Sequence, residues 1–113
     1  MPITDDQALN LYIQAATGET QAAVCSRQLT GFRAEFALRF EAWRIANAKG
    51  LRKGALLADA KGLNKISPPN LKSFATMNAQ ILENLPEDDL QRRCNELLSS
   101  LLQASMKLTS SKD

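Results

Sequence analysis

The sequence predicts an all-α protein, a helical bundle of four main helices and one short basic helix. Residues that favour strands are scarce, because the 113 residues include one Val, one Tyr and one Trp, whereas strong helix formers such as Ala, Leu, Gln and Lys abound. Glycine and proline are few, five and four in number. Apolar side chains also recur at helical spacing along most of the chain. We expect a single domain over residues 1–113.

The first helix is expected over residues 4–17. Thr4 and Gln7 match a capping box, and Asp5 and Asp6 suit the positive end of a helix dipole. Apolar residues then follow on one face, and Gly18 should end the helix. These residues are Leu9, Tyr12, Ile13 and Ala16.

The second helix is expected over residues 20–48 and should organise the core. Six apolar residues fall within about 80° of one another at about 100° per residue: Cys25, Leu29, Phe32, Phe36, Phe40 and Trp43. This stripe keeps its phase across Gly31, which predicts a continuous helix despite the cost of about 1 kcal/mol for glycine relative to alanine. Leu38 and Ile45 lie on the back of this helix. Either the first helix covers them, or they form a contact surface for a second chain.

Residues 46–65 contain an internal repeat, Ala-Asn-Ala-Lys-Gly-Leu-Arg-Lys followed by Ala-Asp-Ala-Lys-Gly-Leu-Asn-Lys. A short helix near 54–60 would join the two copies. One interpretation is that Gly50 and Gly62 cap two ordinary helix ends, each with a lysine that complements the dipole. The other is a paired basic corner that holds an anion or an acidic partner surface.

Two helices complete the prediction. Ser67-Pro68-Pro69-Asn70 should be extended, so a helix over 70–85 begins at Asn70 or one turn earlier. Its expected core face carries Leu71, Phe74, Ile81, Leu82 and Leu85. The last helix is expected over 87–108, with three acids in its first turn, and 109–113 should be a frayed tail. Its apolar stripe contains Leu90, Cys94, Leu97, Leu101, Ala104 and Leu108.

The sequence shows no recognisable catalytic, metal or cofactor motif. Histidine is absent, which removes the commonest general base and metal ligand. Two cysteines cannot complete a four-ligand zinc site. Cys25 and Cys94 could pair in principle, but because both fall on apolar faces, we expect two buried free thiols. The acidic run Glu87-Asp88-Asp89 is typical of a helix start. We therefore expect no enzymatic activity, cofactor or metal.

Basic residues concentrate in one segment. The net charge is only +2, but residues 44–65 carry six cations against Asp59 alone: Arg44, Lys49, Arg52, Lys53, Lys61 and Lys65. This segment has no aromatic residue, whereas nucleic-acid binding usually pairs a basic patch with exposed aromatics or a recognition helix. The segment is either a nucleic-acid-binding surface or a basic loop that faces only solvent.

The preferred hypothesis is a small non-enzymatic protein-binding protein: an adaptor, an inhibitor or immunity-type protein, a chaperone or a small assembly subunit. The alternative is nucleic-acid binding through residues 44–65. Self-association through the leucine seam of the last helix is a further expectation. We expect a cytoplasmic protein with no membrane partner. The candidate partner-binding residues are Leu38, Ile45, Arg44, Lys49, Arg52, Lys53, Lys61 and Lys65.

Overall fold

The structure, a computed structural model, describes the backbone of residues 3–110 and the side chains of residues 3–101. Across these residues it contains helices and no strand, which confirms the all-α class. The helices are α1 (Asp5–Gln28), α2 (Phe32–Ala46), α3 (Ala48–Ala60), α4 (Leu71–Glu83) and α5 (Glu87–Ser110). The molecule is flat, with Cα extents of 41 × 40 × 18 Å, so it is about two helices thick.

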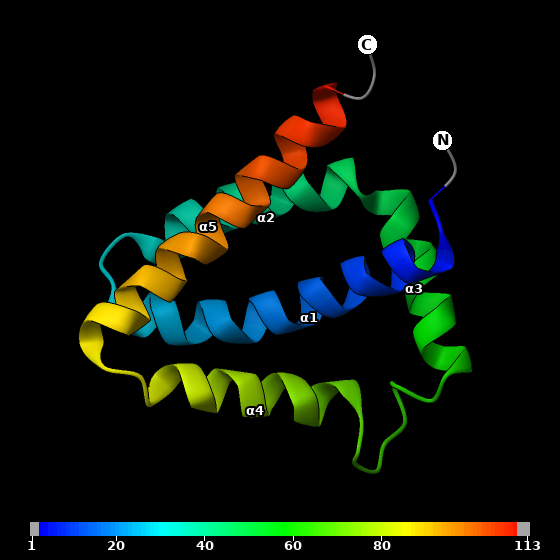
Figure 1. Cartoon of the computed structure of the whole chain (residues 1–113), viewed down its shortest axis with the longest axis horizontal. Helices are drawn as coiled ribbons and strands as arrows, with labels where there is room; N and C mark the ends of the chain where they lie inside the picture. The colour runs from blue at the N-terminus through cyan, green and yellow to red at the C-terminus, as the bar shows by residue number, and fades with distance from the viewer. Residues whose placement is uncertain (1–2, 111–113) are drawn as a thin grey trace.

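Helix α1 is the centre of the fold, because it contacts each of the other four helices (Figure 1). The predicted capping box is confirmed: the Thr4 hydroxyl accepts from the Gln7 amide at 3.1 Å, and the Gln7 side chain accepts from the Thr4 amide at 3.0 Å. Gly18 does not end the helix, contrary to the prediction. It is buried beside Leu97 of α5, and tertiary burial offsets the intrinsic cost of a glycine inside a helix.

The predicted helix over 20–48 is wrong, because the chain turns at residues 29–31. Gly31 has a left-handed backbone with φ 81° and precedes the first residue of α2. The chain then reverses, and α2 packs back against α1 (Figure 1). The apolar stripe keeps its phase because Cys25 of α1 and Phe32 of α2 face one shared core cluster. Continuity of phase therefore does not distinguish a long helix from a helical hairpin.

Helix α3 begins directly after Asn47, a buried residue whose side chain donates to the Trp43 carbonyl oxygen at 2.8 Å. The predicted short helix near 54–60 therefore starts six residues earlier, at Ala48. Gly50 is not a helix cap: it lies inside α3, buried against α1. Gly62 is the expected cap, with φ 77°, and Leu63 donates to the Ala58 carbonyl oxygen at 2.9 Å, as in a Schellman motif.

The last two helices begin where the sequence predicts. The Asn70 side chain accepts from the Ser73 amide at 2.7 Å and caps α4. The described part of the leucine seam of α5 is buried at Leu90, Cys94 and Leu101. Ala104 and Leu108 lie outside the residues whose side chains are described. Helix α5 continues to Ser110, and the rest of the predicted frayed tail, 111–113, lies outside the described residues.

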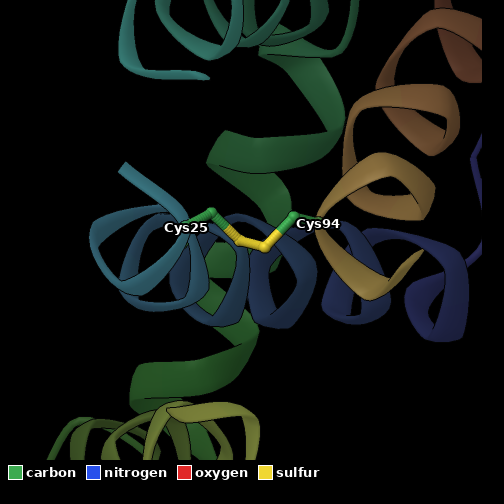
Figure 2. Close-up of a disulfide and its surroundings, with 2 residues drawn as sticks. All are labelled: Cys25 and Cys94. Atoms are coloured by element: carbon green, nitrogen blue, oxygen red, sulfur yellow. A yellow bond between two sulfur atoms is a disulfide. The ribbon is translucent and has the colours of Figure 1, made fainter. Parts of the chain in front are cut away.

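Cys25 and Cys94 form a disulfide, so the prediction of two free thiols is wrong. Figure 2 shows the bond joining α1 to α5. The two Cα atoms are 5.8 Å apart, and 69 positions separate the residues in sequence. Both side chains are fully buried. The placement of both cysteines on apolar faces was predicted correctly, but their opposition depends on how α1 and α5 pack.

Candidate protein-binding surface

A groove of about 330 Å³ lies between α1, α4 and α5, and its floor reaches α2. Helices α4 and α5 diverge from the turn at residues 84–86, and α1 runs between them (Figure 1). The apolar lining comes from all four helices: Gly18, Cys25, Phe36, Phe40, Ile81, Leu82, Leu85, Leu97 and Leu101. A groove formed by the faces of three helices is a suitable seat for a further helix.

Polar side chains also line the groove: Gln14, Thr17, Gln21, Asn78, Arg93, Glu96 and Ser100. Arg93 and Glu96 are the two charged members of the lining, and both are exposed. Neither forms an ion pair or a side-chain hydrogen bond with any residue that the structure describes. An unpaired cation and an unpaired anion are thus available to a ligand seated in this groove.

An exposed apolar strip on α4 extends the groove. Phe74, Met77 and Ile81 are 50%, 57% and 58% exposed, and their spacing places them within about 60° on the helix surface. Ile81 belongs to both the strip and the groove lining. Single exposed apolar residues are ordinary on protein surfaces, but three on one face, continuous with a groove, are typical of an interaction site.

A hydrogen bond and a disulfide are among the contacts that hold the walls of the groove against its floor. The Thr20 hydroxyl of α1 lies 3.2 Å from the Ala75 carbonyl oxygen of α4 and 2.9 Å from the Thr17 carbonyl oxygen of α1, so its one proton is shared between these acceptors. The Cys25–Cys94 disulfide joins α1 to α5. Helices α4 and α5 make few direct contacts beyond their connecting turn. The opening between them is therefore set by how each packs on α1.

The structure places Leu38 and Ile45 on an exposed face of α2, where they are 72% and 68% exposed. The first helix does not cover them, so that interpretation is wrong, and a contact surface for a second chain stays a prediction. They do not extend the strip on α4, since α2 and α4 are not in contact within the described residues. Among the residues whose side chains are described, there are thus two separate apolar patches.

The structure does not gather the basic residues into one pocket. Lys53 is engaged with α1, where its ammonium lies 3.0 Å from an Asp5 carboxylate oxygen and 2.9 Å from the Ile3 carbonyl oxygen. A guanidinium nitrogen of Arg44 lies 3.7 Å from a carboxylate oxygen of Glu41. The other four cations are exposed and have no ion pair among residues 3–101: Lys49, Arg52, Lys61 and Lys65.

The paired basic corner considered for the repeat is not formed. It requires two helix ends close together, but Gly50 is inside α3 and only Gly62 caps a helix. Lys49 and Lys61 are separated by about 18 Å along the α3 axis. The cations are therefore spread along α3 and beyond its end rather than gathered at a shared anion site.

The strip on α4 was missed because Phe74 and Ile81 were assigned to the core. Leu71 and Leu82 do face the core as predicted, together with Ala75, whereas Phe74 and Ile81 are exposed. A signal was present in the sequence. Around the circumference of this helix, the large apolar residues span about 140°, with Met77 at one edge and Leu82 at the other. One core-facing stripe needs about 100°, so part of this arc had to face something other than α1.

Among the described residues, no group of three or more Cys, Asp or Glu side chains is placed to hold a metal ion. None of the helices, as far as they are described, is long and apolar enough to cross a membrane. No protein-family model matches the chain, and neither a curated protein nor a solved structure is significantly similar to it.

Proposed function

We propose that this protein is non-enzymatic and acts by binding another protein, as an adaptor, an inhibitor, a chaperone or a small assembly subunit. The observation that supports the proposal is the exposed apolar strip of Phe74, Met77 and Ile81 together with the groove that it adjoins, whose lining is partly apolar and partly polar. Exposed apolar surface of this kind costs solubility unless a partner covers it.

The proposed ligand is an amphipathic helix lying along α4 in the groove. Such a helix presents apolar residues three and four positions apart, which suits a seat with apolar walls on α4 and α5. Arg93 and Glu96 at the edge of the groove favour a ligand with charges of both signs. Leu38 and Ile45 remain a second candidate surface, smaller because it has two large apolar residues.

The compartment is part of the proposal. We expected the cytosol, but the Cys25–Cys94 disulfide favours an oxidising compartment, because cytosolic reductants keep most thiols reduced. Analysis of the intact mass of the protein purified from its native host, with thiols blocked at lysis, tests this point. A disulfide-bonded chain supports the oxidising compartment, and a chain with two blocked thiols supports the cytosol.

Nucleic-acid binding remains the alternative proposal. Four exposed cations on and after α3 support it: Lys49, Arg52, Lys61 and Lys65. Their neighbour Leu56 is the one large apolar side chain exposed on α3. Because no aromatic side chain accompanies them, this surface would bind phosphates without reading bases.

Site-specific photo-crosslinking tests the protein-binding proposal. A photoreactive phenylalanine analogue at Phe74 should capture a defined protein in the native host, whereas the same group at Leu56 on α3 should not. Met77→Asp should abolish capture from position 74, because it places a charge in the apolar strip. Leu38→Asp is the matched control on the other patch. If Leu38→Asp abolishes capture and Met77→Asp does not, the surface on α4 is the wrong one.

A further inference from the structure

We propose that the surface on α4 binds a second copy of this chain, through two α4 helices packed antiparallel about a two-fold axis near Met77. This inference rests on the proposed function, since it names the partner of the same surface. Three features of α4 support it: the symmetric spacing of its exposed apolar residues, the absence of charge on this face, and the burial of the competing seam on α5.

The exposed apolar residues are nearly symmetric about Met77. Phe74 precedes it by three residues and Ile81 follows it by four, which is about 4.5 Å and about 6 Å along the helix axis. A two-fold axis near Met77 therefore places each Phe74 beside Ile81 of the second copy and brings the two Met77 side chains together. Two-fold interfaces require this kind of self-complementary surface.

The strip is also electrically suited to its own copy. Helix α4 has only two charged residues, Lys72 and Glu83, and they lie about 160° and about 180° around the helix from Phe74. A carboxylate oxygen of Glu83 lies 3.8 Å from a guanidinium nitrogen of Arg27 of α1. The exposed neighbours of the strip on α4 itself are uncharged, Gln80 and Asn84, and the charged residues that line the groove with Ile81 are one cation and one anion, Arg93 and Glu96. Juxtaposed copies thus avoid like-charge repulsion.

Other surfaces are less suited to self-association. We expected dimerisation through the leucine seam of the last helix, but Leu90 and Leu101 of that seam are buried within one chain. The patch at Leu38 and Ile45 lies on a helix face that also carries the exposed Glu41–Arg44 pair. Of these three surfaces, the face on α4 is therefore the one that is both exposed and free of charged residues of its own helix.

The size of the strip sets the expected strength of the dimer. Three half-exposed side chains offer roughly 100 Å² each, so the interface falls in the small class, below about 1,200 Å² in total. Interfaces of this class are typical of weak, transient complexes. We expect a monomer–dimer equilibrium with a dissociation constant on the order of micromolar or above.

Sedimentation velocity on the full chain across the micromolar to millimolar range measures this equilibrium. The native protein should shift from monomer to dimer, and Met77→Asp should remain monomeric at every concentration. Leu56→Asp is the matched control, since it introduces the same charge at an exposed apolar position on α3 and should leave the dimer intact. Thermal melting by circular dichroism should show both variants folded, because both positions are exposed.

Zero-length oxidative crosslinking tests the antiparallel register. Met77→Cys should form a covalent dimer, because the two side chains meet at the axis. A mixture of Phe74→Cys and Ile81→Cys chains should form the mixed dimer, whereas Phe74→Cys alone should not. Leu56→Cys controls for random collision. The native cysteines do not interfere, because they are buried and bonded to each other.

The outcomes separate this inference from the proposed function. A native protein that stays monomeric at all concentrations, with Met77→Cys no more crosslinked than Leu56→Cys, overturns the second copy as partner. If a photoreactive group at Phe74 then captures a different protein, the proposed function stands without the dimer. If the photoreactive group captures neither a second copy nor a different protein, the dimer and the proposed function are both overturned. A dimer that Met77→Asp leaves intact likewise rejects the α4 interface.

Discussion

A single methyl group added at Gly54 should loosen the crossing of α3 over α1. Gly54 is buried where α3 passes closest to α1. An ideal Cβ at this position would overlap the Ala8 carbonyl oxygen and lie 2.8 Å from the Tyr12 Cβ and 3.0 Å from the Ala8 carbonyl carbon. Two of these three atoms are main-chain atoms and the third is a Cβ, so none of them can rotate away. The helices must separate by about 1 Å to restore ordinary contact distances.

The magnitude follows from two opposing terms. Overpacking a close contact costs about 1–3 kcal/mol, and a contact with rigid main-chain atoms belongs at the upper end of that range. Replacing glycine by alanine inside a helix returns about 1 kcal/mol. Gly54→Ala should therefore destabilise the protein by about 2 kcal/mol, which lowers Tm by roughly 8 °C for a chain of this length.

Chemical denaturation followed by tryptophan fluorescence provides the assay. Trp43 is the single tryptophan and is fully buried, so its emission should report global unfolding. Gly18→Ala is the matched control. Its Cβ would lie 3.8 Å from Leu97 Cδ1, an ordinary contact, so this variant should gain about 0.5–1 kcal/mol. Equal stabilisation by both substitutions would refute the close crossing at Gly54.

Three further predictions concern other parts of the molecule. Reducing the Cys25–Cys94 bond should cost about 4 kcal/mol on the loop-closure model for a loop of this length, measured by denaturation with and without reductant; unchanged stability would show that the bond does not form. Asn70→Ala should lower stability by about 1 kcal/mol through loss of the α4 cap, whereas Asn70→Asp should retain most of it. If the protein binds nucleic acid, the double variant Lys49→Ala/Arg52→Ala should weaken retention at low salt and flatten its salt dependence; no retention of the native protein at low salt would reject that alternative.

The sequence predicted those helix ends that depend on contacts between residues a few positions apart. The Thr4–Gln7 capping box, the Asn70 cap and the Gly62 cap each depend on residues within a few positions of one another. Such contacts form in the same way whatever lies across the core. Their positions could therefore be read from the sequence.

Glycines outside such a local pattern were misjudged because their roles are tertiary. Gly18 continues a helix and Gly31 breaks one, yet each has similar helix-forming neighbours. What distinguishes them is packing: Gly18 lies under α5, whereas Gly31 takes a left-handed conformation where the chain reverses. The same reason explains the disulfide, since two apolar faces do not reveal that Cys25 and Cys94 are opposed.

The candidate site was predicted only in part. Exposure of Leu38 and Ile45 was one of two interpretations, and the structure selects it. The strip on α4 was not predicted, because apolar residues were assigned to the core wherever a helical face could be drawn. The groove depends on the angle between α4 and α5, which cannot be predicted from the residue pattern of either helix alone.

The disulfide encloses most of the chain in a covalent ring. Helices α2, α3 and α4 all lie between Cys25 and Cys94 in sequence, and so does the exposed loop around Ile66, the preferred kind of site for a protease. A single cut in this loop would leave both fragments joined, with one band on a non-reducing gel and two on a reducing gel. A nicked molecule could therefore keep its fold, and α4 would keep its place beside α1.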